Sequence, residues 1–165
     1  MPSIIFICTA NRCRSPMAAG ILSRLTTDRG EDDRWQIESA GTWAAPDLPA
    51  TALARSVSQA HGIDLSGHRA RPLTGSLLHA ADVILVMTRF HLEALRAEFP
   101  EVAEKTYLIS QLIGQSFDID DPVNGTVDDY QACFDDLSQI LSQGYARLKE
   151  LAQREAPISS SEAAD

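Results

Sequence analysis

Short apolar runs recur along the chain and alternate with stretches in which apolar residues follow helical spacing. The runs Ile4–Ile7 and Asp82–Met87 are typical of strands buried on both faces of a parallel sheet. Two further strands are expected at Trp35–Ala40, which alternates, and at Thr106–Ile109. Helices are expected over residues 15–29, 50–61, 74–80, 88–99 and 127–153, with polar loops between them.

Strands that alternate with helices predict an α/β fold with a single four-stranded parallel sheet, right-handed crossovers and helices on its faces. Ligands in such folds bind at the carboxyl ends of the strands. The 165 residues suit one domain, which we assign to residues 1–152. The small, polar residues 153–165 are expected to form a disordered tail.

The loop from Cys8 to Arg14 joins the first predicted strand to the first helix. Ser15 is a favoured N-cap and Pro16 is tolerated at the first helical position, so we expect the helix to begin there. Such a loop turns backbone N–H groups inward at the positive end of the helix dipole and forms an anion cradle. Arg14 could bind two phosphate oxygens with its planar guanidinium.

Cys8 lies at the mouth of this cradle. A helix N-terminus and a nearby arginine favour the thiolate, which is the reactive form of cysteine. The loop therefore combines a nucleophile with a phosphate clamp. The simpler interpretation is an ordinary buried cysteine at a strand end, and the strand before the loop and the helix after it favour a nucleophile in a phosphate-binding loop.

Composition narrows the possible partners. Fourteen basic and 23 acidic residues give a net charge of −9, which offers no electrostatic reason to bind nucleic acid. A basic loop in an acidic protein suits one small anionic group. No apolar run approaches ~20 residues, so no membrane span is expected, and the start of the chain does not resemble a secretory signal. We expect a cytoplasmic protein, and the oligomeric state is left open.

A phosphate ester also needs an acid to protonate its leaving group. Asp121, stiffened by Pro122, is the candidate, while Asp118 and Asp120 fit solvated loop charges. Asn11 tolerates the left-handed backbone conformation expected in the middle of the loop. His68 fits equally well a hydrogen bond to the loop or the cap of a turn.

The remaining histidines and Cys133 are expected to be structural or exposed. His61, His79 and His91 fall on helix patterns and are expected to be structural or exposed. Cys133 lies on the apolar stripe of the last helix and is expected to pack in the core.

The three cysteines do not suggest a disulfide framework. Cys13 could pack at the base of the loop, or form a reversible disulfide with Cys8 that protects Cys8 from further oxidation. Both interpretations remain open. No metal site is expected, because Cys8 and Cys13 lack a second Cys or His pair at ligand spacing.

The chain up to about Leu151 resembles the low-molecular-weight protein tyrosine phosphatase family. The resemblance is carried by the Cys8–Pro16 loop, Ser39-Ala40-Gly41, His61-Gly62-Ile63, His68–Leu73, Ala81–Thr88 and Asp121-Pro122. It implies a phosphatase I-like (Rossmann-like) fold that acts on a phosphorylated protein without a cofactor or metal. It also implies Cys8 as the nucleophile, Arg14 as the phosphate and transition-state ligand, and Asp121 as the acid.

The resemblance implies supporting roles too. In the family, a loop serine stabilises the thiolate, and Ser15 matches it. A hydrogen-bond network that supports the loop matches Asn11, His68 and Ser39. Thr9, Ala10, Arg12 and Cys13 complete the phosphate-binding loop.

Four positions depart from the family or shape its pocket. Ala10 stands where the family usually has Gly, and its methyl needs suitable backbone angles. Trp43 resembles one wall of the slot for an aromatic ring, whereas Val123 replaces the aromatic residue of the other wall. Arg12 replaces the aliphatic residue of tyrosine phosphatases and the Thr of the related protein-arginine phosphatases.

A cation at the pocket wall should repel phosphoarginine, so we rank phosphotyrosine first and phosphoarginine second. Thioredoxin-coupled arsenate reductase is a less favoured alternative. That chemistry needs two further cysteines near Met87-Thr88, and no Cys lies between Cys13 and Cys133. A non-catalytic phosphate-binding module is also less favoured, because Cys8, Arg14 and Asp121 are all present.

Overall fold

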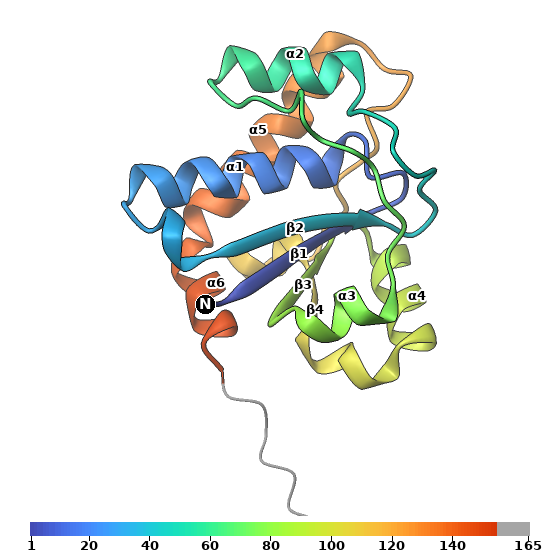
Figure 1. Cartoon of the computed structure of the whole chain (residues 1–165), viewed down its shortest axis with the longest axis vertical. Coiled ribbons are helices and arrows are strands. Elements are labelled where there is room, and N and C mark those ends of the chain that lie inside the picture. Colours follow the sequence, from blue (N-terminus) through green and yellow to red (C-terminus); the bar gives the residue numbers. More distant parts are fainter. Residues whose placement is uncertain (155–165) are drawn as a thin grey trace, which may run out of the picture.

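Four parallel strands form the centre of the computed structural model, which describes residues 1–154. Their order across the sheet is β2-β1-β3-β4 (Figure 1). The strands are β1 (Ser3–Cys8), β2 (Gln36–Gly41), β3 (Val83–Val86) and β4 (Thr106–Leu108). The predicted fold class is confirmed. The predicted tail lies outside the described residues from position 155 on, and Gln153 caps the last helix.

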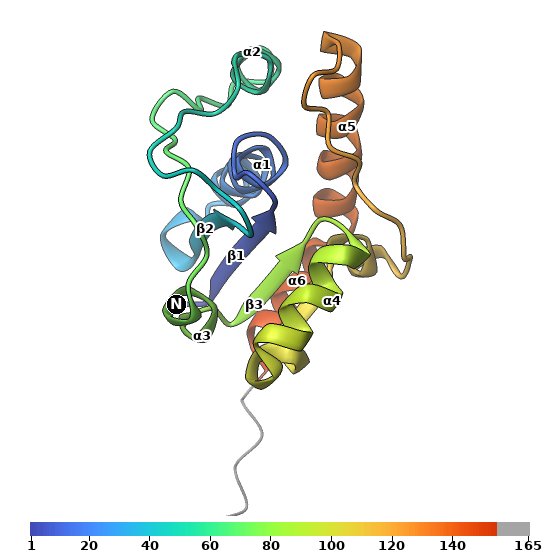
Figure 2. The same cartoon turned by 90° about the vertical axis from the view of Figure 1, so that its right-hand side faces the viewer.

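Helices cover both faces of the sheet (Figure 2). They are α1 (Arg14–Asp28), α2 (Ala52–Ala60), α3 (Gly75–Ala80), α4 (Arg89–Glu98), α5 (Val127–Gln143) and α6 (Tyr145–Ala152). The side chains of β1 alternate between two cores, and all six of its residues are buried. Phe6 packs in the core made with α1, α5 and α6, and Ile7 packs in the core made with α3 and α4. This explains why the β1 sequence is apolar at consecutive positions.

The helix after the loop begins at Arg14 rather than at the predicted Ser15. Cys13 occupies the N-cap position without a side-chain cap. Pro16 is then the third helical residue, where the missing N–H costs nothing because the first turn has no intrahelical acceptors. The hydroxyl of Ser15 does not cap the helix and is free for the site.

The long helix predicted over residues 127–153 is two helices, α5 and α6, separated by Gly144. A Cβ at Gly144 would lie 2.6 Å from Cβ of Leu112, so only glycine fits where the chain turns close to that residue. The apolar stripe continues across the turn, which is why periodicity did not reveal the break. Three short 3₁₀ helices, Asp32–Arg34, Pro100–Lys105 and Ile109–Ile113, were not predicted either.

The carboxyl ends of β1 and β2 lie together at the right of Figure 1, and the loop after β1 lies there as well. β3 pairs with the other side of β1, so α4 begins beside the same loop. Within residues 1–154, no helix combines the length and apolar character needed to span a membrane.

Candidate active site

In the loop of residues 8–14, backbone carbonyl groups and backbone N–H groups have different partners. Its carbonyl oxygens accept hydrogen bonds from the surrounding protein. The carbonyl oxygen of Thr9 accepts the N–H of Trp43 at 2.9 Å, and that of Arg12 accepts the N–H of Thr51 at 3.0 Å. The carbonyl oxygen of Asn11 lies 2.6 Å from Nε2 of His68. In the described part of the chain, none of the hydrogen bonds outside regular helices and strands uses a backbone N–H of residues 9–14 as donor. Those N–H groups remain available to an anion, as the predicted cradle requires.

Asn11 is the residue around which the loop is supported. Its φ of 57° lies in the left-handed region, and its side chain is fully buried. Nδ2 donates to the hydroxyls of Ser15, at 2.8 Å, and Ser39, at 2.9 Å, while Oδ1 accepts the N–H of Arg71 at 3.0 Å. The carbonyl oxygen of Asn11 also accepts the contact from His68, so Asn11 connects the loop to β2 and to the segment after α2. The structure therefore brings together the predicted network, and His68 bonds the loop rather than a turn.

Cys8 lines a small cavity. Its Sγ lies 2.9 Å from Oγ of Ser15, a distance at which the hydroxyl can donate to a thiolate. The cavity measures about 80 Å³ and is lined by Cys8, Ala10, Arg12, Cys13, Arg14, Thr51, Asp121 and Val123. All three residues predicted to be catalytic therefore border one cavity.

The guanidinium of Arg14 is held from several sides, and the residue is only 4% exposed. Nη1 donates to the carbonyl oxygen of Ile119 at 2.9 Å. Nη2 lies 3.4 Å from Oδ2 of Asp121 and 3.5 Å from Oγ1 of Thr9. These contacts hold the guanidinium of a residue that lines the cavity.

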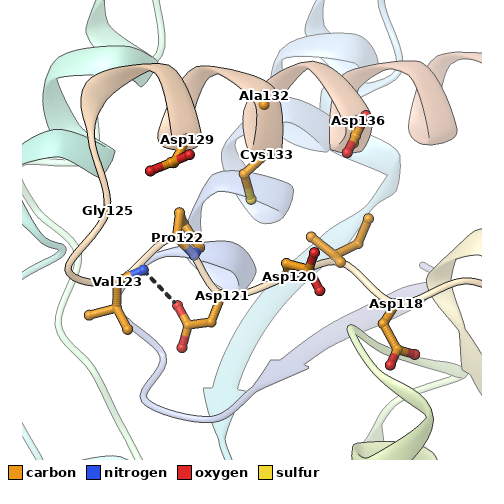
Figure 3. A pocket seen from close by; sticks show the side chains of 11 residues that line it. Asp118, Asp120, Asp121, Pro122, Val123, Gly125, Asp129, Ala132, Cys133 and Asp136 are labelled. Atoms are coloured by element: carbon orange, nitrogen blue, oxygen red, sulfur yellow. Dashed lines mark hydrogen bonds between the residues drawn. The ribbon is translucent and has the colours of Figure 1, made fainter.

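The three neighbouring aspartates have different surroundings (Figure 3). Asp121 is partly exposed and borders the Cys8 cavity, and its Oδ1 accepts the N–H of Val123 at 3.1 Å. Asp118 instead pairs with Arg89, accepting its N–H at 2.8 Å. Asp120 borders a second hollow and not the cavity of Cys8. Only Asp121 is therefore placed to act on a group bound at Cys8.

The second hollow, of about 250 Å³, adjoins the first and lies between the segment of residues 118–125 and α5 (Figure 3). Cys133 borders it from α5 and is part of the core on that side of the sheet, as predicted. Burial raises the pKa of the Cys133 thiol to about 12. This thiol therefore stays protonated and is a poor nucleophile.

Cys13 contacts residues that the sequence did not suggest. Its Sγ lies 3.4 Å from Oη of Tyr130 and 3.6 Å from Oγ1 of Thr51, and the Thr51 hydroxyl donates to Tyr130 at 3.0 Å. Burial raises the pKa of the Cys13 thiol. All three cysteines are free thiols here, and the regulatory pairing of Cys13 with Cys8 stays a prediction.

The predicted pocket walls are only partly assembled. Arg12 and Val123 line the cavity, whereas the Trp43 residue is 86% exposed and does not line it. Arg12 is held by a bond from its Nε to the carbonyl oxygen of Pro49 at 2.8 Å. Ala10 has no positive φ, so its methyl is compatible with the loop.

His91 was expected to be structural or exposed, and the structure places it against the phosphate loop. It is buried, and its Nε2 lies 2.8 Å from Oγ1 of Thr9 inside the phosphate loop. The sequence signal that could have identified this contact is the position of His91 three residues after the Thr88 N-cap. That helix follows β3, the strand next to β1. Among residues 1–154, no group of three or more His, Cys, Asp or Glu side chains is arranged to hold a metal ion.

The fold, the anion cradle and the thiol at its mouth place this protein among the cysteine-dependent phosphatases. A family model described as low molecular weight phosphotyrosine protein phosphatase matches residues 3–154. The chain belongs to this family.

Individual relatives differ in the substrate that their names give. A protein-arginine-phosphatase of Bacillus subtilis is 33% identical, over 89% of this chain and 97% of that protein. The low molecular weight protein-tyrosine-phosphatase Etp of Escherichia coli is 32% identical, over 88% and 94%. The crystal structure of a low molecular weight protein tyrosine phosphatase from T. tengcongensis superimposes with a TM-score of 0.84 at 34% identity, covering 89% of this chain and 99% of that one.

Proposed function

We propose that this protein hydrolyses phosphotyrosine in proteins through a cysteinyl-phosphate intermediate. The observation that carries the proposal is that Cys8, Arg14 and Asp121 border one cavity, beneath a loop whose N–H groups are available to phosphoryl oxygens. The reaction needs no group beyond these side chains and water. Location in the cytoplasm stays a prediction from the sequence.

In the first step, Cys8 attacks phosphorus as its thiolate, so the S–P bond forms as the bond to the tyrosine oxygen breaks. Arg14 and the loop N–H groups hold the phosphoryl oxygens. Asp121, in its acid form, donates a proton to the leaving oxygen. The tyrosine then departs as a neutral phenol.

In the second step, Asp121 takes a proton from a water molecule, whose oxygen attacks phosphorus. The S–P bond breaks and inorganic phosphate is released. The Ser15 hydroxyl, 2.9 Å from Sγ, donates to the departing thiolate and stabilises it. The enzyme returns to its starting state.

Arg12 supports phosphotyrosine over phosphoarginine. Its side chain lines the cavity, and within the described residues no carboxylate lies within salt-bridge distance of it. A positive charge there repels the guanidinium of phosphoarginine and attracts acidic residues that flank a phosphotyrosine. Phosphoarginine remains the second candidate, because relatives in Bacillus subtilis and Geobacillus stearothermophilus are named protein-arginine-phosphatases.

The test is phosphate release from matched phosphotyrosine and phosphoarginine peptides in EDTA, with Cys8→Ser as the control. We expect turnover of phosphotyrosine that is lost in Cys8→Ser. Arg12→Ala should raise phosphoarginine turnover relative to phosphotyrosine. A preference of the unmodified enzyme for phosphoarginine would overturn the substrate assignment, and an unchanged ratio in Arg12→Ala would overturn the role of Arg12.

A further inference from the structure

His91 is a buried polar residue that the proposed reaction does not use. It lies in the first turn of α4 and is 2% exposed. Burial, together with the charge of Arg14, lowers the pKa of His91 to about 4. The ring is therefore neutral near pH 7, with one nitrogen as a donor and the other as an acceptor.

Both ring nitrogens have partners. Nδ1 lies 3.0 Å from Oγ1 of Thr88, which also caps α4 by accepting the backbone N–H of His91 at 3.2 Å. Nε2 lies 2.8 Å from Oγ1 of Thr9. The first contact stays within one helix end, whereas the second crosses from α4 to the loop after β1. Capping of α4 requires only Thr88, so it does not account for the contact with Thr9.

Thr9 connects this ring to the phosphate clamp. Its Oγ1 lies 3.5 Å from Nη2 of Arg14, and a guanidinium can only donate, so the Thr9 oxygen is the acceptor. The same Nη2 faces Asp121. A different rotamer of Thr9 would remove one of the few acceptors that direct Nη2.

We infer that His91 is a positioning residue for the proposed reaction: it holds the hydroxyl of Thr9, and Thr9 in turn directs Nη2 of Arg14 at the phosphate-binding loop. The inference rests on the proposed function for its kinetic consequence. The structural part of the inference is the contact between His91 of α4 and Thr9 of the loop, through which the position of α4 affects the position of Arg14.

Two amide substitutions separate this role from simple packing. In His91→Gln the side-chain amide can take the place of Nε2 and keep the contact with Thr9. In His91→Asn the shorter amide takes the place of Nδ1 and keeps only the contact with Thr88. We expect His91→Asn to lower kcat on p-nitrophenyl phosphate about five- to tenfold, and His91→Gln to stay within about twofold, as the loss of one hydrogen bond predicts.

Thr9→Val removes the hydroxyl at nearly constant shape and should reproduce the loss seen in His91→Asn. Because both changes break the same chain of contacts, the double variant should lose no more than either single variant. His79→Asn on α3 is the matched control, since His79 is exposed and its side chain contacts Gly75 and Glu101, neither of which belongs to the loop. It should leave kcat unchanged.

Calorimetric titration with inorganic phosphate measures the clamp without turnover. We expect phosphate to bind His91→Asn and Thr9→Val about fivefold more weakly than it binds the unmodified enzyme or His91→Gln. Equal losses in His91→Gln and His91→Asn, additive losses in the double variant, or unchanged phosphate binding in Thr9→Val would each overturn the inference. Absence of turnover in the unmodified enzyme would instead overturn the proposed function, and the phosphate titration would still test the positioning role.

Discussion

Nη2 of Arg14 lies 3.4 Å from Oδ2 of Asp121. Arg14 begins α1 and Asp121 lies in the segment before α5, more than one hundred positions away, and their contact places a carboxylate beside the proposed phosphate site. A bound phosphoryl group would compete with Asp121 for the same guanidinium. The contact thus keeps the proposed acid beside the bound phosphoryl group, whose bond to the tyrosine oxygen breaks as Asp121 protonates that oxygen.

Asp121→Asn should lower kcat for a phosphotyrosine peptide by roughly 10²- to 10⁴-fold, because the amide cannot donate the proton or activate water. Steady-state kinetics measures the effect. Asp120→Asn and Asp118→Asn are the matched controls, and both should retain most of the activity because neither residue borders the Cys8 cavity. A loss in Asp120→Asn as large as that in Asp121→Asn would contradict the assignment.

Asn11→Ala should destabilise the protein more than Asn124→Ala does. Both residues have left-handed φ values, 57° and 63°, so both variants share the backbone cost of alanine in that region. Only Asn11 is buried, and its loss leaves the N–H of Arg71 without its acceptor. Urea unfolding should show an additional loss of roughly 1–3 kcal/mol in the free energy of unfolding for Asn11→Ala. Equal losses would mean that the network does not stabilise the loop.

Gly41→Ala should impair catalysis, because a Cβ at position 41 would collide with the carbonyl oxygen of Thr9 in the phosphate loop. Gly67→Ala is the control, since a Cβ there meets nothing within 4 Å. Displacement of the loop by a fraction of an ångström should lower kcat roughly 10- to 100-fold in Gly41→Ala. Normal kcat in this variant would show that the loop adapts without losing its geometry.

Acidification should reveal His91 as a destabilising group. Its pKa falls from the ordinary 6.5 to about 4 in the folded protein, so between these values the unfolded chain binds more protons. The free energy of unfolding should therefore fall as the pH drops from 6.5 toward 4, by up to about 3 kcal/mol from this residue. Urea unfolding at pH 7 and pH ~4.5 should show a smaller decrease in His91→Gln than in the unmodified protein. Identical decreases would contradict the lowered pKa.

The fold features that the sequence predicted correctly, and the candidate site residues that it picked out, depend on neighbouring residues. The apolar run Ile4–Ile7 predicted β1 because both faces of that strand are buried. The spacing of Cys8 and Arg14 predicted the cradle because a strand, a short loop and a helix suffice to build it. Asp121 was separable from its neighbours because Pro122 follows it.

The features that the sequence missed depend on distant contacts. The residue pattern predicted Ser15 as the N-cap. The contact of its hydroxyl with Cys8 was implied only by the family resemblance, and its hydrogen bond from Asn11 was not predicted. The break falls at Gly144, where the chain passes too close to Leu112 for a side chain. His91 meets Thr9 only because β3 pairs with β1.

Trapping of the phospho-enzyme tests the central claim most directly. Asp121→Asn should form the cysteinyl-phosphate and hydrolyse it slowly, so rapid acid quench with p-nitrophenyl phosphate followed by mass spectrometry should find one phosphoryl group on Cys8. Cys8→Ser/Asp121→Asn, treated identically, should show no phosphoryl group on a cysteine. A phosphoryl group on Cys13 or Cys133, or turnover that persists in Cys8→Ser, would contradict the account.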